Sequence, residues 1–135
     1  MREAGTGKIN FAGGEPFLNP KTLGELCKKS HELGMAAVSI ISNGCRTSRK
    51  WMEEYGYFVD VLGVSVDSFV STTNAKIGRG GDANNGNANC VMRVRELCAD
   101  HDIIFKMNAV VCSLNWQEDI YEKMRKLDPK CWKVF

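Results

Sequence analysis

The sequence predicts an α/β fold in which parallel strands alternate with outer helices, as part of a (β/α) barrel. Short apolar runs rich in β-branched residues, typical of buried parallel strands, alternate with amphipathic helical patterns. This regular alternation is the pattern of successive βα units. A closed eight-unit barrel needs about 250 residues. The 135-residue chain is therefore expected to be one partial core domain, residues 1–135, truncated at both ends.

Five strands are predicted from apolar runs whose side chains alternate between an apolar and a polar face. The last strand is expected to be cut by the end of the chain. The predicted strands cover residues 9–12, 37–42, 61–66, 103–111 and 132–135.

Four amphipathic helices are predicted between these strands. The first has Asn19 as its N-cap, Pro20 at the first helical position and Gly34 as its C-terminal stop. The other three helices are indicated by apolar residues at helical spacing. These residues are Trp51, Tyr55 and Phe58; Val91, Val94, Leu97 and Cys98; and Ile120, Met124 and Leu127.

Three further segments carry boundary signals. Asn115 and Glu118 have the spacing of a capping box, which predicts the start of the last helix. Residues 1–5 are expected to be the last turn of an earlier helix with Gly5 as its stop, and residues 78–89 form a long Gly- and Asn-rich connection.

Composition excludes several classes of function. A net charge of +2 without a basic run predicts no nucleic-acid partner. No leader-like or bilayer-spanning apolar run occurs, so the chain is expected to be cytoplasmic without a membrane segment. The six cysteines lack the spacing of a disulfide framework or metal site, which predicts free thiols.

The polar faces of the strands predict a polar ligand. A packed barrel interior normally holds Val, Ile and Leu, whereas here Lys8, Lys106 and Lys133 come from three different strands. On one face they are expected to bind an anion such as a phosphate. The alternative is that they lie on the solvated face of an open sheet.

Glycine and polar residues follow the strands, where parallel α/β folds bind ligands. After the first strand, glycines allow close approach to the backbone, and a proline ends the strand. This arrangement predicts a site for an ammonium or amide, and the alternative is an ordinary turn. The candidates along this edge are Gly13, Gly14, Glu15, Pro16, Asn43 and Ser65. Arg79 lies between glycines on the long connection, where it is expected either to bind a carboxylate or phosphate with two hydrogen bonds or to be a solvated loop charge.

Six motifs resemble, in order and spacing, those of the radical S-adenosylmethionine superfamily, and most closely its antiviral, nucleotide-modifying branch of viperin-like enzymes. They run from one end of the chain to the other. They are residues 8–18 (KINFAGGEPFL), 38–44 (VSIISNG), 67–69 (DSF), 77–80 (IGRG), 105–108 (FKMN) and 132–135 (WKVF).

The resemblance implies a partial (β/α)6 barrel and a radical reaction. In this branch a [4Fe-4S] cluster reduces S-adenosylmethionine, and the resulting 5′-deoxyadenosyl radical takes the 4′ hydrogen of a nucleoside triphosphate, with CTP favoured. The product is a 3′-deoxy-3′,4′-didehydro nucleotide that acts in antiviral defence. The resemblance also implies an electron donor and cluster-assembly machinery as partners. Complete members associate with the endoplasmic reticulum or lipid droplets through an N-terminal helix absent here.

Two sets of site residues follow from the resemblance. Gly13, Gly14, Glu15 and Pro16 would hold the methionyl amine of S-adenosylmethionine, Ser65 and Arg79 its carboxylate, and Asn43 would lie near the cofactor. The substrate set is Lys8, Asn10, Lys106, Asn108 and Lys133.

The chain departs from the branch at the redox centre. The three cysteines that bind the cluster, in a C-x-x-x-C-x-x-C loop after the first strand of the barrel, are missing. No metal ligand is assigned, and the chain by itself is expected to be inactive. Cys131 also occupies a position where the branch is expected to have an arginine.

Two alternative functions remain open at this point. One is a non-catalytic remnant that binds a nucleotide or S-adenosylmethionine. The other is an aldolase-like barrel in which Lys106 forms a Schiff base.

Overall fold

The computed structural model describes residues 5–79 and 87–135. Five strands form one parallel sheet in the order β1-β2-β3-β4-β5, so every neighbour in space is also the neighbour in sequence. The order never reverses, which is typical of a barrel wall and differs from doubly wound folds. The strands are β1 (Lys8–Phe11), β2 (Ala37–Ser42), β3 (Val61–Ser65), β4 (Ile104–Ala109) and β5 (Cys131–Val134).

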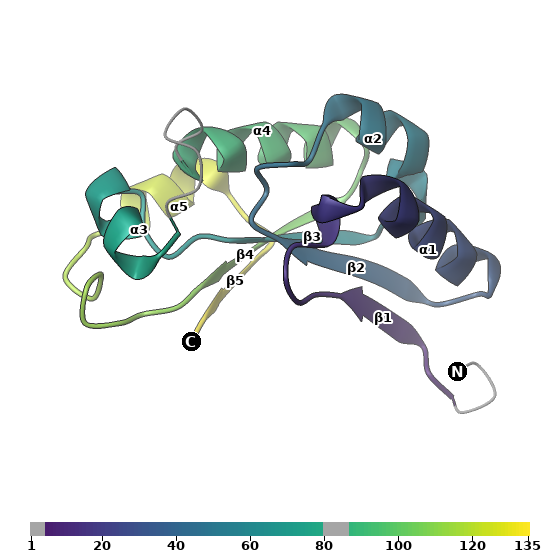
Figure 1. The fold of residues 1–135 in the computed structure, drawn as a ribbon, viewed down its shortest axis with the longest axis horizontal. Coiled ribbons are helices and arrows are strands. Elements are labelled where there is room, and N and C mark those ends of the chain that lie inside the picture. The colour runs from purple at the N-terminus through teal and green to yellow at the C-terminus, as the bar shows by residue number, and fades with distance from the viewer. Residues whose placement is uncertain (1–4, 80–86) are drawn as a thin grey trace.

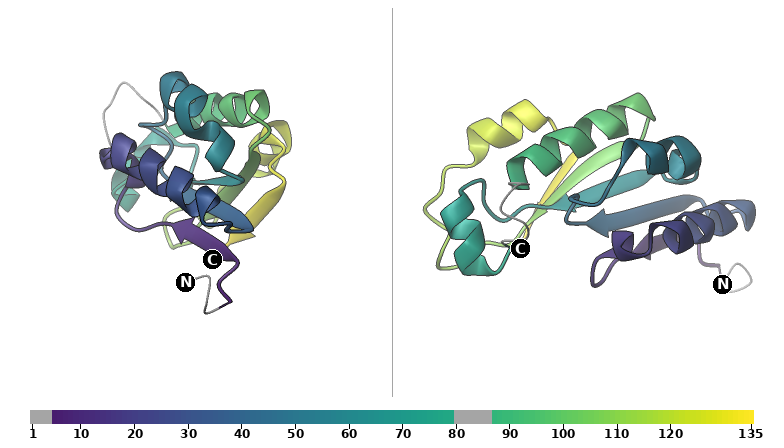
Figure 2. Two further views of the ribbon diagram at one scale, coloured as in Figure 1. Left: turned by 90° about the vertical axis from the view of Figure 1, so that its right-hand side faces the viewer. Right: turned by 45° about the horizontal axis from the view of Figure 1, so that its top comes forward.

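The helices α1, α2 and α4 cover one face of the sheet, while α3 lies beyond the carboxyl ends of the strands (Figures 1 and 2). No described helix covers the opposite face. The elements are η2 (Pro16–Leu18), α1 (Pro20–Glu32), α2 (Arg49–Tyr55), η3 (Gly56–Phe58), α3 (Ser71–Ile77), α4 (Asn87–Asp100) and α5 (Tyr121–Leu127).

The core lies between the sheet and this helix layer. Alternate residues of the three central strands point into it, which buries their apolar side chains while the next residue in each strand faces the other way. The strand residues in the core are Val38, Ile40, Leu62, Val64, Phe105 and Met107, and their partners on the helices include Leu23, Cys27, Met52, Val91, Val94 and Leu97.

The first helix begins and ends where the sequence predicts. Pro20 is the first helical residue, and Gly34 adopts a left-handed conformation (φ +73°) immediately after the C-cap. The N–H groups of Gly34 and Met35 donate to carbonyls in the last turn, which satisfies helix acceptors that would otherwise lack partners. Asn19 is the N-cap residue, but its side chain makes no capping hydrogen bond.

The predicted capping box of the last helix is wrong. The helix begins at Tyr121, because the buried side chain of Asn115 is used elsewhere. Its amide nitrogen donates to the carbonyls of Asp67 and Val110, each at 2.8 Å, and its oxygen accepts the N–H of Cys112 at 2.7 Å. Asn115 therefore fixes the loop after β4 against the end of β3.

The helix α3 is not predicted by the sequence pattern. The stretch Ser71–Ile77 has too few apolar residues to show a helical period, and only Asn74 is buried. That residue explains the position of the helix, since its side-chain nitrogen donates to the carbonyl of Ser68 at 2.8 Å.

Some predictions fall outside the described residues. The helical turn predicted at residues 1–5 involves residues 1–4, and most of the Gly- and Asn-rich connection lies in residues 80–86. Across the described ranges, no helix is both long enough and apolar enough to cross a membrane.

Candidate functional site at the carboxyl edge and the bare face of the sheet

The loop after β1 presents open backbone at the carboxyl edge of the sheet. Gly13 and Gly14 both have positive φ angles, +100° and +53°, which residues with a side chain rarely adopt. No atom lies within 4 Å of the position a Cβ would take at either residue. A ligand can therefore approach this backbone closely, as the sequence predicts.

Glu15 connects this loop to the end of β2. Its Oε1 accepts the N–H of Phe17 at 3.1 Å and the hydroxyl of Ser42 at 2.7 Å, and its Oε2 accepts the N–H of Asn43 at 2.8 Å. A carboxylate has about four acceptor positions, so three donors leave room for about one more. The half-buried carboxylate is thus held in place beside the open glycine backbone.

The loop after β2 is held from both sides. The buried Ser42 hydroxyl accepts the N–H of Gly44 at 2.9 Å, and Asn43 Oδ1 accepts the N–H of Cys45 at 2.9 Å. From α4, the guanidinium of Arg93 donates to the carbonyls of Gly44 (3.2 Å) and Cys45 (2.9 Å). These contacts leave the exposed Asn43 in a fixed position beside Glu15.

Sequence reasoning missed Ser42 and Arg93 as members of the site. Strand alternation places Ser42 on the core side of β2, where a hydroxyl must find a partner. The need of a buried hydroxyl for a hydrogen-bond partner could therefore have indicated Ser42. By contrast, nothing in the sequence of α4 indicates which carbonyls Arg93 reaches.

Beyond the end of β3, Asp67 links three segments. Its carboxylate accepts the N–H of Val110 at 2.8 Å and forms an ion pair with Nε of Arg79. Asp67 is 5% exposed, whereas about a third of the Arg79 side chain is exposed. Ser65 is half-buried two residues before Asp67, so the candidates for the cofactor carboxylate lie at the same end of β3.

All five predicted substrate residues lie on the face of the sheet that no described helix covers. We call this uncovered face of the sheet the bare face. The register places Lys106 beside Gly63 and Cys131 on it. Its members from strand alternation and register are Lys8, Asn10, Ser39, Ile41, Gly63, Ser65, Lys106, Asn108, Cys131 and Lys133.

The bare face brings some of these residues together and separates others. Lys106 and Lys133 are on adjacent strands, and Asn108 is paired directly with Lys133. Lys8 is three strands away from Lys106, or roughly 14 Å along the sheet at about 4.8 Å per strand. Asn10 lies beside Lys8 on β1, where its oxygen accepts the Ser39 hydroxyl at 2.8 Å. Lys106 and Lys133 are therefore close enough in the sheet to share one anion, whereas Lys8 lies at the far edge.

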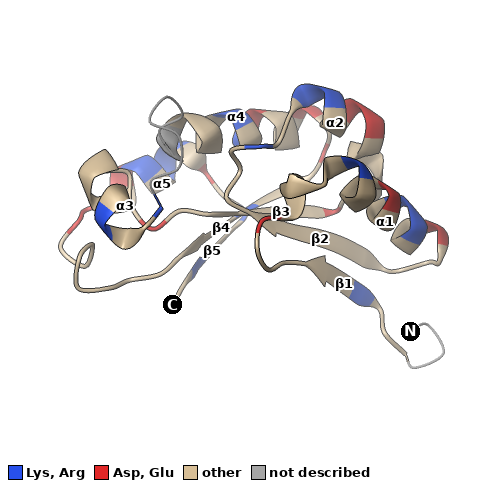
Figure 3. Cartoon of the chain, viewed as in Figure 1, with Lys and Arg blue, Asp and Glu red and all other residues tan. Residues whose placement is uncertain are grey.

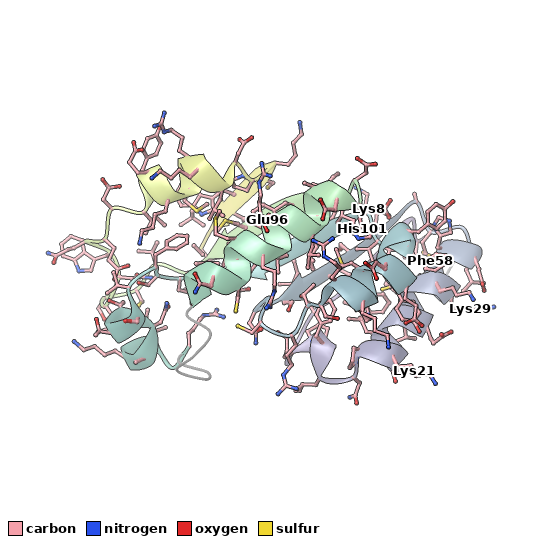
Figure 4. The ribbon with its side chains drawn as sticks, turned by 90° about the horizontal axis from the view of Figure 1, so that it is seen from above. Lys8, Lys21, Lys29, Phe58, Glu96 and His101 are labelled. Atoms are coloured by element: carbon pink, nitrogen blue, oxygen red, sulfur yellow. The ribbon has the colours of Figure 1, made fainter. Side chains whose placement is uncertain are left out.

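The charge on the strands is of one sign. The five strands contain three lysines and no acidic residue (Figure 3). By contrast, the exposed side of the helix layer carries both signs, as Lys21, Lys29 and Glu96 show (Figure 4). A mixed surface is typical of solvated helices, whereas a face with cations alone favours an anionic ligand.

Asn108 lies on this face beside Lys133. Its Oδ1 is buried and has no hydrogen-bond partner among the described residues. A buried acceptor left unpaired costs about 1–3 kcal/mol.

The cysteines do not form a cluster site. None of the six cysteines forms a disulfide, and within residues 5–79 and 87–135 no group of three His, Cys, Asp or Glu side chains is placed to hold a metal ion. The described residues therefore do not fit a [4Fe-4S] cluster. They do fit S-adenosylmethionine, because open glycine backbone, a fixed carboxylate and a guanidinium lie along one edge.

A shallow pocket occurs at the opposite, amino-terminal end of β4, away from the bare face. Its lining includes Arg95, Ile103, Asp128 and Lys130. None of the predicted site residues takes part in it. In a parallel barrel this end serves stability rather than chemistry.

Comparison with known proteins identifies relatives along the entire chain. The chain is 41% identical to the S-adenosylmethionine-dependent nucleotide dehydratase RSAD2 of Danio rerio, and the alignment covers 100% of the chain and 38% of that protein. It is 33% identical to an S-adenosylmethionine-dependent nucleotide dehydratase of a Thermoplasmatales archaeon, again over 100% of the chain and 47% of that protein. The chain thus spans between about two fifths and one half of these relatives. No family model matches it.

Among solved structures, the chain is similar in fold to a domain of pyruvate-formate lyase-activating enzyme from Bacteroides vulgatus. The TM-score is 0.60 at 19% identity, over 78% of this chain and 60% of that domain. This similarity concerns the fold and supports the partial barrel. The sequence relatives show a more specific similarity. Over its whole length, the chain is thus similar to S-adenosylmethionine-dependent nucleotide dehydratases.

Proposed function

We propose that this chain is the part of a radical nucleotide dehydratase that binds S-adenosylmethionine and a nucleoside triphosphate. The observation that carries the proposal is the bare face, where all charged residues of the strands are lysines and where β1 leads into an open glycine loop. The relatives are named S-adenosylmethionine-dependent nucleotide dehydratases, which matches both halves of this surface.

At the glycine edge the chain binds and orients the cofactor. The backbone of Gly13 and Gly14 and the carboxylate of Glu15 take the methionyl amine, while Ser65 and Arg79 take its carboxylate. Pro16 ends the loop, and Asn43 lies beside Glu15 near the cofactor. When bound, S-adenosylmethionine supplies a 5′-deoxyadenosyl radical. The iron-sulfur cluster that the family implies has no ligand set among the described residues, and we place its cysteines in another part of the protein.

On the bare face the chain holds the nucleotide. Lys106 and Lys133 bind the phosphates from adjacent strands, and Asn108, which is paired with Lys133, belongs to the same substrate-binding surface. Lys8 and Asn10 complete the surface at β1. We favour CTP as substrate, its 3′-deoxy-3′,4′-didehydro analogue as product, and antiviral defence as the role. An electron donor and cluster-assembly machinery are the expected partners of the complete protein.

The test uses the complete protein encoded by the reading frame that contains this chain. After anaerobic cluster reconstitution, each nucleoside triphosphate is incubated with S-adenosylmethionine and a reductant, and 5′-deoxyadenosine and the nucleotide product are measured. We expect both products with CTP. If no nucleoside triphosphate yields 5′-deoxyadenosine, the proposal is wrong. Binding of both ligands without 5′-deoxyadenosine would instead indicate a non-catalytic binding protein.

The substitution Lys106→Ala tests the bare face within this assay. We expect it to raise the KM for the nucleotide about tenfold, because a charge-assisted contact to phosphate contributes about 1.5 kcal/mol. Lys29→Ala on the outer side of α1 is the control, and its KM should not change. Equal KM values for Lys106→Ala and wild type would remove Lys106 from the site. A Schiff-base role for Lys106 finds no support in these relatives, which are named as dehydratases.

A further inference from the structure

We infer that Asp67 is a positioning residue that orients Arg79 toward the carboxylate of the bound cofactor. The inference rests on the proposed function, because it assigns a second residue to the contact made by Arg79. Asp67 itself does not touch the ligand. It acts by holding one side of the guanidinium, so that the other side faces the edge of the sheet.

The surroundings of Asp67 fix its carboxylate rigidly. Its side chain is almost fully buried, with one oxygen on the N–H of Val110 and the other on Nε of Arg79. Its own carbonyl accepts the side-chain amide of Asn115 at 2.8 Å, and that amide also reaches the carbonyl of Val110. Asp67 is thereby tied to the end of β3, the loop after β4 and the second residue after α3.

The backbone of Arg79 is anchored as well. Gly78 ends α3 in a left-handed conformation (φ +82°), and the N–H of Arg79 donates to the carbonyl of Asn74 at 2.8 Å. Asn74 is itself held by the carbonyl of Ser68. Both the base and the Nε atom of the Arg79 side chain are therefore fixed relative to β3.

What remains of the guanidinium suits a carboxylate. Asp67 occupies Nε, and among the described residues the two terminal nitrogens of Arg79 make no hydrogen bond. Two parallel N–H groups in a fixed plane match the two oxygens of a carboxylate. An unpaired arginine would lose up to about 2 kcal/mol of side-chain entropy on binding, whereas the ion pair with Asp67 orders the side chain beforehand.

A purely structural role for Asp67 is the competing explanation, since it also holds the N–H of Val110. Asp60 provides a matched control for that role. At the amino end of the sheet, Asp60 Oδ2 accepts the N–H of Val38 at 2.7 Å, and no ion pair of Asp60 occurs within the described residues. Asp60→Asn therefore changes a similar backbone contact without affecting Arg79.

The experiment compares two ligands that differ only in the carboxylate. Affinities of the complete protein for S-adenosylmethionine and for decarboxylated S-adenosylmethionine are measured by equilibrium dialysis, for wild type, Asp67→Asn and Asp60→Asn. We expect Asp67→Asn to weaken binding of S-adenosylmethionine about tenfold and to leave the decarboxylated ligand within about twofold. Asp60→Asn should leave the affinities for both ligands unchanged. A thermal unfolding scan of each variant confirms that it is folded.

Other outcomes separate this inference from the proposed function. If wild type binds neither ligand, the proposed function fails and the inference falls with it. If wild type prefers S-adenosylmethionine and Asp67→Asn keeps that preference, or weakens both ligands equally, the inference alone is wrong. Should Asp67→Asn not fold, Arg79→Gln and Arg79→Lys replace it. In that case both arginine variants should lose the preference for S-adenosylmethionine over the decarboxylated ligand, because neither glutamine nor lysine provides a planar guanidinium held by Asp67. If Arg79→Lys retains that preference, the inference is overturned.

Discussion

Glu15 has two functions that are inseparable at the scale of a single residue. Its carboxylate supplies the negative charge at the glycine edge and also joins the loops after β1 and β2 through Ser42 and Asn43. The sequence predicts the charge. The joining contact became visible only in the structure, because its partners are 27 and 28 residues away.

Ser42 should contribute strongly to stability for this reason. Its hydroxyl donates to Glu15 and accepts the buried N–H of Gly44, so Ser42→Ala leaves that N–H without a partner. We expect a loss of about 1–3 kcal/mol in the free energy of unfolding, measured by urea denaturation. Ser39→Ala, on the bare face of the same strand, is the control and should cost less than about 1 kcal/mol. Equal losses in the two variants would contradict this role.

At the scale of elements, the contact between α1 and α2 depends on a glycine. Gly24 lies inside α1, where glycine normally weakens a helix, but the ring of Tyr55 from α2 packs directly over it. The indole nitrogen of Trp51 also donates to the carbonyl of Pro20 at 2.7 Å. Close approach of the two helices therefore explains a residue that helix propensity disfavours.

Gly24→Ala should destabilise the protein despite the higher helix propensity of alanine. A Cβ there would lie 2.5 Å from ring atoms of Tyr55, and overpacking costs about 1–3 kcal/mol, more than the gain of about 1 kcal/mol from propensity. Thermal unfolding should show a lower Tm. Thr22→Ala, exposed on the same helix, should leave the Tm unchanged or slightly higher. A Gly24→Ala variant as stable as wild type would show that the helices can separate freely.

The elements also show the limits of local patterns. Strand positions were predicted to within about two residues because alternation of apolar residues is a local signal. The helix α3 was missed because it has too few apolar residues to show a helical period. The last helix was predicted to begin too early because the side chain of Asn115 bonds to the carbonyl of Asp67, 48 residues away. Such a partner overrides the local preference of asparagine for a cap.

For the whole molecule, the division into an apolar and a polar face of the sheet leads to a prediction about pH. The buried thiols of Cys27 and Cys98 on the apolar side each have a pKa raised from 9.0 to about 12 by burial. Below pH 9 both folded and unfolded thiols are protonated and contribute no pH dependence. Between about pH 9 and pH 12 only the unfolded thiols ionise, so the free energy of unfolding falls as the pH rises.

The slope from each thiol is about 1.4 kcal/mol per pH unit over that range. Urea unfolding at several pH values between 8 and 11 measures it. Cys27→Ala should show a shallower decline than wild type by about this amount per pH unit, whereas Cys131→Ala, in which the lost thiol is exposed, should decline like wild type. Identical slopes for Cys27→Ala and wild type would mean that the Cys27 thiol is not desolvated.

The sequence by itself determined the parallel α/β fold, the positions of the strands, the cationic face and the similarity to S-adenosylmethionine-dependent nucleotide dehydratases. These depend on periodicities of two and 3.6 residues and on short motifs, all of which are local along the chain. Only the tertiary structure decided that Glu15 joins two loops, that Asp67 pairs with Arg79, and that Lys8 lies far from Lys106. The reason is physical, because these contacts join residues separated by many positions, and strand register together with loop packing chooses among partners of equal chemistry.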